Sequence, residues 1–281
     1  MTDPRRTLAP LGRRRASVTA AEPVGAYRFL RCTDPGGPPP RPGQFYMLAA
    51  VERWGGGADE RPYLPRAFSY LRARPGELEF LLEDVGPGTR RLAELRPGDE
   101  LWLLGPLGVG FASPREDRAP LLVGGGIGIV PLACWQDELL AAGHAAPALL
   151  GFRDAAHAEA AALMRDVALA TDDGGAGRAG LVTELLDERL DADDAVEVYA
   201  CGPPAMLEAV RLMTAEREVP AQLALEAGMA CGYGACFGCV VPTRDGYLRL
   251  CVDGPVLEAA AVEAVPAARG PPSAAWSSST P

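Results

Sequence analysis

The chain has 281 residues, of which 48% are hydrophobic, which suffices for two ordinary domains and a small appendage. Its formal net charge of −10 argues against a general nucleic-acid-binding role, because such proteins present a basic surface. No stretch is apolar for long enough to predict a membrane-spanning helix, and the basic N-terminus lacks the apolar segment of a secretory signal. We therefore expect a cytoplasmic protein with neither nucleic-acid nor membrane partners.

The first hundred residues predict a basic tail followed by an all-β domain. Residues 1–16 contain five arginines, and we expect them to be a disordered tail. Between residues 17 and 114, short apolar runs alternate with Pro-Gly turns, a pattern typical of an antiparallel β-barrel. The strand-like runs cover residues 45–51, 67–71, 78–82 and 100–104.

One of these runs begins with Arg66, Ala67, Phe68 and Ser69. An arginine fork and a serine hydroxyl displayed from one strand suit a phosphate or diphosphate, and Phe68 can lie against a flat ring system. Taken alone, this pattern is more typical of a surface strand with a polar edge.

A glycine loop favours the phosphate interpretation. Gly88 and Thr89 precede a predicted helix at residues 90–95, and backbone N–H groups at a helix start bind phosphate well.

From residue 115 the pattern changes to alternating strands and helices, which predicts a parallel sheet with ligands at the carboxyl ends of its strands. An apolar strand at 119–123 leads into a turn with Gly125, Gly126 and Gly128, and a helix is expected at 132–142. This arrangement forms a phosphate cradle, although the spacing is not the full dinucleotide fingerprint and an ordinary tight turn is the alternative.

The alternation continues to residue 220. We predict strands at 148–152 and 195–200, helices at 158–167, 181–190 and 205–216, and a turn at 171–175. Cys201, Gly202 and Pro203 follow the last strand, where a ligand is expected, but proline is also common at a helix start. The two histidines, His144 and His157, are assigned no role, and no catalytic acid or base is assigned.

Four cysteines dominate the segment 221–265. Cys231, Cys236, Cys239 and Cys251 follow the spacing C-x4-C-x2-C, then eleven residues, then C. This is the plant-type ligand pattern of a [2Fe–2S] cluster, and the glycines between the cysteines allow backbone N–H groups to approach the sulfurs. A structural zinc site, disulfides or buried thiols are the alternatives. Cys32, Cys134 and Cys201 are predicted to be small core residues, and residues 266–281 a disordered tail.

Together these motifs resemble the ferredoxin–NADP reductase superfamily. The cysteine segment, with the motifs around Gly105 to Gly108 and Thr171 to Gly174, closely resembles the electron-transfer subunits of dihydroorotate dehydrogenase B. That family usually has proline and an aliphatic residue where this chain has Ala67 and Phe68.

The resemblance implies a multi-domain α+β fold with an FAD-binding antiparallel β-barrel, an α/β nucleotide domain with a parallel sheet for NAD(H), and a small C-terminal [2Fe–2S] lobe. The cysteines would hold the cluster. NAD would lie over Gly125, Gly126, Gly128, Cys201, Gly202 and Pro203. The residues that would contact FAD are Arg66, Ala67, Phe68, Ser69, Leu81, Leu82, Glu83, Gly88 and Thr89.

The resemblance also implies a function. The chain would pass electrons between an FMN-containing catalytic dihydroorotate dehydrogenase subunit and NAD in pyrimidine (UMP) biosynthesis, within a heterotetramer. The alternatives are an NAD(P)H-dependent reductase serving a hydrogenase or an oxygenase, an iron–sulfur sensor without turnover, and a zinc-stabilised scaffold.

Overall fold

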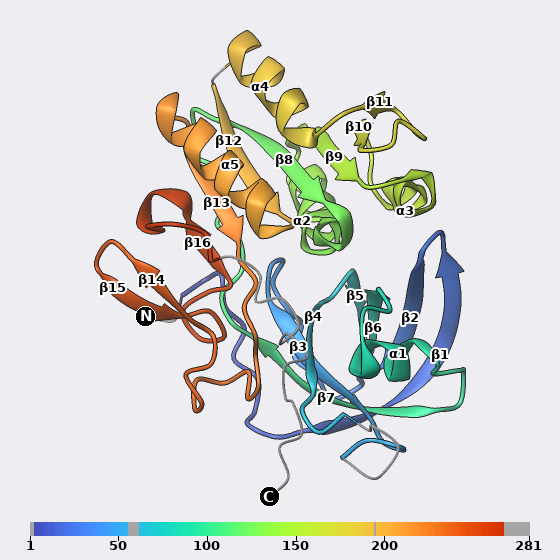
Figure 1. Cartoon of the computed structure of the whole chain (residues 1–281). Coiled ribbons are helices and arrows are strands. Elements are labelled where there is room, and N and C mark those ends of the chain that lie inside the picture. Colours follow the sequence, from blue (N-terminus) through green and yellow to red (C-terminus); the bar gives the residue numbers. More distant parts are fainter. Residues whose placement is uncertain (1–2, 56–61, 194, 267–281) are drawn as a thin grey trace, which may run out of the picture.

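The N-terminal part of the chain forms a curled antiparallel sheet with strand order β4-β3-β7-β1-β2-β6-β5, at the lower right of Figure 1. The computed structural model describes residues 3–55, 62–193 and 195–266. Leu71, just after β4, donates its backbone N–H to Glu79 O of β6 at 2.7 Å, which brings opposite edges of the curled sheet together. The strands are β1 (Arg14–Val24), β2 (Tyr27–Thr33), β3 (Phe45–Ala50), β4 (Arg66–Ser69), β5 (Arg72–Arg74), β6 (Glu77–Leu82) and β7 (Glu100–Leu107).

Strand β3 is buried on both of its faces. Because successive side chains of a strand point in opposite directions, Tyr46 and Leu48 pack inside the curled sheet while Phe45 and Met47 pack outside it. The outer pair belongs to a core that continues into the remainder of the molecule. The unbroken apolar run at 45–51 is therefore explained by burial from both sides.

The expectation of a disordered tail over residues 1–16 is wrong for most of that segment. Strand β1 begins at Arg14, whose guanidinium pairs with Asp34 at 2.7 Å. Thr7 and Arg5 also make backbone hydrogen bonds, to Gln44 and Gly110 respectively. The arginines misled the prediction because they were taken as a solvated charge run, whereas Arg13, Arg14 and Arg15 contact Trp102, Asp34 and Glu100 of the folded domain. The predicted C-terminal tail, from residue 267 onward, lies outside the described residues.

The second layer is a sheet with strand order β11-β10-β9-β8-β12-β13-β16, in which only the β13–β16 pairing is antiparallel among the described strands. Its strands are β8 (Ala119–Gly125), β9 (Ala148–Phe152), β10 (Val167–Thr171), β11 (Arg178–Ala179), β12 (Val196–Cys201), β13 (Ala221–Ala224) and β16 (Val256–Glu258). The helices are α2 (Ile129–Ala141), α3 (Ala155–Ala158), α4 (Val182–Ala192) and α5 (Pro204–Glu216).

The helices cover both faces of this sheet, as a parallel sheet requires. In β8, Leu121 and Val123 pack in the same core as residues of α4 and α5, whereas Leu122 packs in the core that contains α2. The predicted strands and helices of this layer match the structure, apart from the segment 158–167.

That segment was predicted as one helix and is not one. Helix α3 begins earlier, because the Asp154 side chain accepts the His157 N–H at 3.0 Å and caps it. A 3₁₀ helix, η2 (Glu159–Leu163), follows. Asp166 then has φ 50°, which ends any helical path, and β10 pairs in parallel with β9.

The cysteine segment forms a small lobe whose two ends are strands of the parallel-type sheet. The lobe contains the hairpin β14 (Val240–Thr243) and β15 (Gly246–Arg249), at the left of Figure 1. However, β13 and β16 flank the lobe and extend the sheet beyond β12, so the sheet and the lobe share residues 221–265. The predicted boundary at residue 220 therefore does not separate the two.

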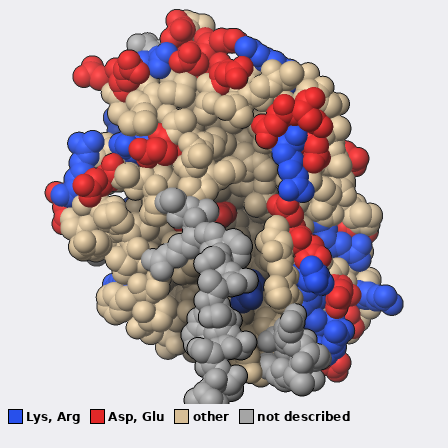
Figure 2. All heavy atoms as spheres, viewed as in Figure 1, with Lys and Arg blue, Asp and Glu red and all other residues tan. Residues whose placement is uncertain are grey.

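The surface charge is unevenly placed. Acidic side chains gather over α4, at the top of Figure 2, and Arg178 and Arg217 pair with several of them. None of the helices in the described ranges has the length and apolar character needed to cross a bilayer.

Candidate functional site

A cavity of about 230 Å³ lies between the curled sheet and the parallel sheet. From the first it is lined by the end of β4, the end of β6 and Thr89 of helix α1 (Pro87–Ala93). From the second it is lined by the glycine turn after β8 and the end of β12. Predicted site residues on its wall are Ala67, Phe68, Ser69, Leu81, Glu83, Thr89, Gly128 and Cys201.

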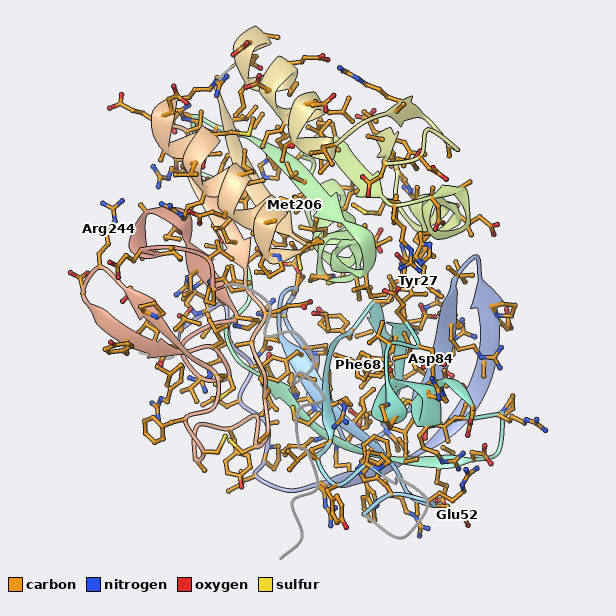
Figure 3. The ribbon with its side chains drawn as sticks, in the orientation of Figure 1. Tyr27, Glu52, Phe68, Asp84, Met206 and Arg244 are labelled. Atoms are coloured by element: carbon orange, nitrogen blue, oxygen red, sulfur yellow. The ribbon has the colours of Figure 1, made fainter. Side chains whose placement is uncertain are left out.

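The flat-ring role expected for Phe68 is compatible with its position. Figure 3 shows Phe68 and Tyr27 on the side of the curled sheet and Met206 on the side of the parallel sheet. The aromatic ring therefore borders the space between the two layers. Leu82 is different, because its side chain is fully buried inside the curled sheet and it is not among the residues that line the cavity.

Arg66 lies against the N-terminal turn of α1. Gly88 makes this approach possible, since a Cβ there would stand 2.5 Å from Arg66 Nε. Burial lowers the pKa of Arg66, and no described carboxylate pairs with it; its Nη1 donates to Leu64 O at 2.6 Å. A guanidinium at a helix start is a suitable partner for a diphosphate.

Thr89 lies within helix α1, whereas it was expected to precede a helix that begins at residue 90. Its Oγ1 accepts the backbone N–H groups of Val85 and Gly86, both at 2.9 Å, and donates to Gly86 O. The hydroxyl therefore closes the loop that leads into α1, and it shapes the cavity wall rather than presenting a free donor.

Glu226 is a cavity residue that sequence reasoning missed. It follows β13 and lines the cavity, and although its side chain is exposed there, desolvation of the carboxyl by the surrounding protein raises its pKa. Nothing in the local sequence distinguishes it from a surface glutamate, because its position depends on the antiparallel addition of β16 to the sheet.

A second cavity, of about 420 Å³, opens beside the first across the carboxyl ends of β8, β9 and β12. Predicted residues on its wall are Gly125, Gly126 and Pro203, together with Glu83. We call it the dinucleotide cleft. Residues that the sequence did not predict as site residues also line it, among them Tyr27, Arg153, His157, Asp172, Thr183 and Met206.

Glycine is required where the two loops of this cleft meet. A Cβ on Gly125 would lie 2.6 Å from Met206 Sδ and 2.7 Å from Pro203 Cδ. A Cβ on Gly202 would contact Met206 and Gly125, and one on Gly128 would overlap the Cys201 carbonyl. The predicted glycine turn and the Cys201–Pro203 loop therefore touch each other, as expected for one binding site.

Tyr27 supplies a polar group that has no partner in the described chain. Its hydroxyl is buried, makes no hydrogen bond and faces the cleft. Burial, together with the charge of Glu83, raises the pKa of Tyr27, so the hydroxyl keeps its proton and can donate to a ligand. Its ring packs edge-on against His157, with 5.2 Å between centroids.

The four lobe thiols form two pairs. The thiols of Cys231 and Cys236 are hydrogen-bonded, and the Sγ atoms of Cys239 and Cys251 lie 3.2 Å apart. Within the described ranges no three ligating side chains converge on a single ion position. Two pairs of thiols match a cluster in which each of two irons takes two cysteine ligands.

Backbone N–H groups point at these sulfurs. Burial raises the pKa of the Cys231 thiol, but the N–H groups of Cys236, Tyr233 and Ala235 outweigh it and lower the pKa to about 6. Burial and the neighbouring Cys239 thiol raise the pKa of Cys251 to about 12. Gly232 and Gly234 have φ of 81° and 88°, so the wrapping loop uses the conformations that glycine allows. The donor set and its cradle therefore fit an iron–sulfur cluster.

The other cysteines behave as predicted. Cys32, Cys134 and Cys201 are buried, with 0%, 7% and 4% exposure, and each belongs to an apolar core. The lobe itself packs on β3. The contact is so close that a Cβ on Gly232 would lie 2.6 Å from Met47 Cγ.

A curled sheet and a parallel sheet with adjoining cavities, followed by a four-cysteine lobe, define a reductase of the ferredoxin–NADP reductase fold with an iron–sulfur lobe. The solved structures agree. The chain is similar to one reported as "Insights into flavin-based electron bifurcation via the NADH-dependent reduced ferredoxin-NADP oxidoreductase structure", with a TM-score of 0.76 and 25% identity over 88% of this chain and 89% of that one. A ferredoxin reductase in carbazole 1,9a-dioxygenase shares the fold, with a TM-score of 0.63, 24% identity, and coverage of 75% of this chain and 67% of that one.

Residues 226–263 match the family model described as the iron–sulfur cluster binding domain of dihydroorotate dehydrogenase B. The chain is 38% identical to the dihydroorotate dehydrogenase B (NAD(+)) electron transfer subunit of Geobacillus kaustophilus, over 79% of this chain and 86% of that protein. It is 36% identical to the subunit of the same name from Caldanaerobacter subterraneus, over 78% and 86%. The chain belongs to the family of dihydroorotate dehydrogenase B electron transfer subunits.

Proposed function

We propose that the chain is the electron-transfer subunit of an NAD-linked dihydroorotate dehydrogenase, working with an FMN-containing catalytic subunit in pyrimidine biosynthesis. Family membership supports this proposal. The observation that carries it is that the cavity of about 230 Å³, which we assign to the flavin and call the flavin cavity, adjoins the dinucleotide cleft at Glu83, which lines both. When bound, FAD exchanges a hydride with NAD and single electrons with the [2Fe–2S] cluster, which is chemistry that no side chain can supply.

The chain's own residues bind and orient these groups. We assign Arg66 and Gly88 to the diphosphate of FAD, and Phe68, Ser69 and Leu81 to the wall around its ring system. Backbone of Ala67 and Leu82 and the side chains of Glu83 and Thr89 complete that site.

The dinucleotide cleft is the proposed NAD site. Gly125 and Gly126 offer backbone close to the diphosphate, and Pro203 packs beside them. Gly128 and Cys201 line the neighbouring smaller cavity, and Gly202 packs against Gly125 and Met206, so we assign these three residues to the junction of the two sites. We assign the cluster to Cys231, Cys236, Cys239 and Cys251.

We assign FAD binding to residues 17–114 and NAD binding to residues 115–220. The cluster lobe lies between β13 and β16 in the chain. We further propose a cytoplasmic location and a heterotetramer with the catalytic subunit. The reducing conditions of the cytoplasm suit thiols that must stay free to bind iron.

The test is anaerobic iron and sulfide analysis with absorption spectra before and after NADH. We expect about two irons and two sulfides per chain and flavin bands that bleach with NADH. Cys239→Ser should lose most of the iron and sulfide, whereas Cys134→Ser, which changes a buried thiol outside the lobe, should keep both. Zinc without sulfide, or a folded protein that takes up no flavin, would refute the function.

The partner is tested separately. Co-expression with an FMN-containing dihydroorotate dehydrogenase subunit should give a complex that reduces NAD with dihydroorotate. A chain that is reduced by NADH but forms no such complex would instead be a reductase for another acceptor.

A further inference from the structure

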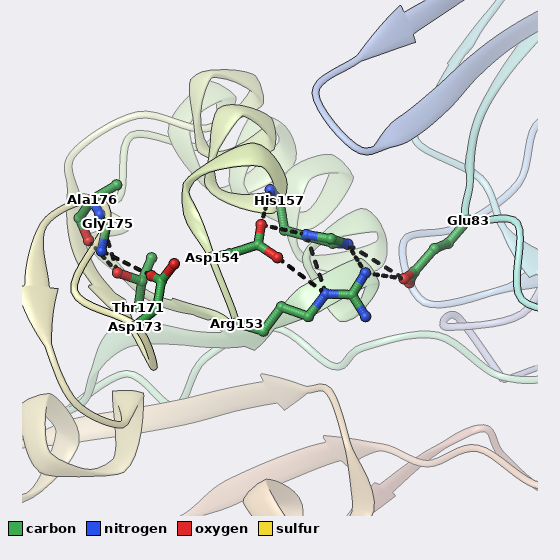
Figure 4. A network of polar contacts seen from close by, with 8 residues as sticks. All are labelled: Glu83, Arg153, Asp154, His157, Thr171, Asp173, Gly175 and Ala176. Atoms are coloured by element: carbon green, nitrogen blue, oxygen red, sulfur yellow. Dashed lines mark hydrogen bonds and ion pairs between the residues drawn. The ribbon is translucent and has the colours of Figure 1, made fainter.

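Glu83 faces two sites and belongs to the curled sheet, whereas the residues it contacts belong to the parallel sheet. It follows β6 and lines both the flavin cavity and the dinucleotide cleft. Across the cleft, Arg153, Asp154 and His157 follow β9 (Figure 4). These four residues, which we call the cleft cluster, connect the two layers at the position where a dinucleotide would enter.

Arg153 has three partners in this cluster. Its Nη2 lies 3.7 Å from Glu83 Oε1 and 2.6 Å from His157 Nε2, and its Nε lies 3.3 Å from Asp154 Oδ2. The contact with Glu83 is an ion pair that is too long to be a good hydrogen bond. It is therefore the one that Arg153 can most easily give up.

The hydrogen bonds of His157 define its tautomer. Its Nδ1 lies 2.6 Å from Asp154 Oδ1, and an ionised carboxylate can only accept, so Nδ1 carries the proton. Asp154 is ionised because hydrogen bonds from His157 lower its pKa to about 2. The other nitrogen, Nε2, then has a free lone pair that accepts from Arg153. His157, whose Nε2 also lies 3.5 Å from Glu83 Oε1, thus helps to hold Arg153 in the orientation that meets Glu83.

The charge of the cleft cluster is unfavourable for a ligand with two phosphates. Its two carboxylates outnumber its one guanidinium, and the carboxylate of Asp172 on the cleft wall adds to the negative charge. The side chain of Arg153 is 64% exposed, whereas those of Glu83 and His157 are 24% and 8% exposed. Arg153 is therefore the member that is free to move, and it carries the positive charge.

We propose that Arg153 exchanges partners when a dinucleotide binds: it leaves the Glu83 carboxylate and pairs with the diphosphate of the ligand. Glu83 thus competes with the ligand for Arg153 and holds the two layers together while the cleft is empty. The proposal rests on the assignment of the cleft to NAD. It adds a positioning role for Glu83 and a ligand-binding role for Arg153.

The experiment is a calorimetric titration of the flavin- and cluster-loaded protein with ADP-ribose, which has the diphosphate but no nicotinamide. Glu83→Gln removes the competing charge and should bind ADP-ribose about two- to fivefold tighter, the range of a partly exposed ion pair. Arg153→Gln should bind it about ten- to a hundredfold more weakly, because a charge-assisted bond to phosphate is lost. The double variant should match Arg153→Gln alone.

Three controls make the result specific. Asp84→Asn changes the neighbouring carboxylate, which pairs with Arg90 at 3.2 Å outside the cleft, and should leave the affinity unchanged. Adenosine, which has no phosphate, should bind all variants equally. Flavin content is measured for each variant by absorption, because Glu83 also borders the flavin cavity.

A structure of the wild-type protein with ADP-ribose provides a measurement that needs no variant. The proposal expects Arg153 on the diphosphate and no longer within 4 Å of Glu83, a distance at which ion pairs are recognised. An unchanged Arg153–Glu83 pair, or a Glu83→Gln protein that binds ADP-ribose as weakly as Arg153→Gln, would overturn the exchange. A wild-type protein that does not bind ADP-ribose at all would instead refute the NAD assignment itself.

Discussion

At the scale of single residues, function depends on side chains whose partners are far away in the sequence. His157 and Tyr27 were given no role from sequence, yet their rings pack against each other at the mouth of the dinucleotide cleft. A lone histidine near a helix start has no signature that separates a packed residue from one in a site. Its contact with Glu83, 74 residues earlier in the numbering, exists only because the curled sheet is placed against the end of β9.

The cysteines are the opposite case. Their spacing alone predicted the ligand set, because the loop that wraps a two-iron cluster requires nearby thiols and glycine at left-handed positions. Gly232 and Gly234 have such positions. What spacing could not give was the pairing of Cys231 with Cys236 and of Cys239 with Cys251, which depends on how the lobe folds.

Glu208 gives a pH dependence that belongs to this scale. Hydrogen bonds from Arg211, and then from the Val265 N–H, lower its pKa from the ordinary 4.5 to about 2. Because the folded-state pKa is depressed, its stabilisation is complete above about pH 4.5 and is lost as the pH falls toward 2. We expect Glu208→Gln to cost about 1 kcal/mol at pH 7.

Urea unfolding of the wild type and of Glu208→Gln between pH 7 and pH 3 checks this dependence. The difference between them should shrink as the pH falls. Glu216→Gln, which changes an exposed carboxyl at the end of the same helix, is the control and should show no such trend. A difference that grows toward pH 3 would contradict the direction assigned to Glu208.

At the scale of elements, strands were predicted most accurately where the strand itself is a run of apolar residues. The strands β3, β6, β8, β9 and β12 were found because apolar runs between turn residues are typical of buried strands. Strands β1, β2 and β5 were missed. Charged residues interrupt them, since one face of each is only partly buried or exposed, and arginines such as Arg14 and Arg31 are held by acidic partners.

The turn after β8 is the element on which both cavities depend. A Cβ on Gly128 would overlap the Cys201 carbonyl and the Gly202 N–H group, neither of which can move without displacing β12. Gly128→Ala should therefore separate the two loops and weaken binding of both FAD and NAD at least about tenfold, beyond the ordinary cost of a single core substitution.

Fluorescence titration of the apoprotein with FAD, and calorimetric titration of the loaded protein with ADP-ribose, measure the two effects. Gly36→Ala is the matched substitution, because a Cβ there meets nothing within 4 Å. If Gly128→Ala binds both ligands as the wild type does, the contact between the two loops is not what shapes the cavities.

At the scale of the whole molecule, the structure contains the three expected parts, but they share one hydrophobic core instead of forming separate units. The core that contains Leu121 and Leu207 of the parallel-sheet layer also contains Met47 of the curled sheet and Cys251 of the lobe. Local patterns identify elements, whereas a core that joins segments distant in the chain leaves no local pattern. The sequence gives no sign that the boundary at residue 220 is misplaced. Strand β16, which pairs with β13 in the sheet, follows the whole lobe in the chain.

Removal of the iron should loosen the backbone of the lobe but leave the parallel-type sheet folded. We expect anaerobic chelation to increase amide exchange in β14, β15 and residues 231–239, while β13 and β16 stay protected, since their hydrogen bonds are made to each other and to β12.

Amide-exchange mass spectrometry of the protein before and after chelation measures both regions, and flavin content provides the control for an intact remainder. Loss of protection in β13 at the same rate as in β14 would show that the cluster holds the sheet together as well. In that case the lobe and the sheet would be one cooperative unit.

The attachment of the lobe by both ends has a consequence for how electrons travel. A carrier module joined by one flexible segment must diffuse to its donor, so the frequency of productive encounters depends on the length of its tether. Here the chain enters the lobe from β13 and leaves it into β16, and Gly232 lies against Met47 of the curled sheet. A cluster bound in the lobe would therefore keep a fixed position relative to the curled sheet, and electron transfer within the chain would not depend on a diffusing module.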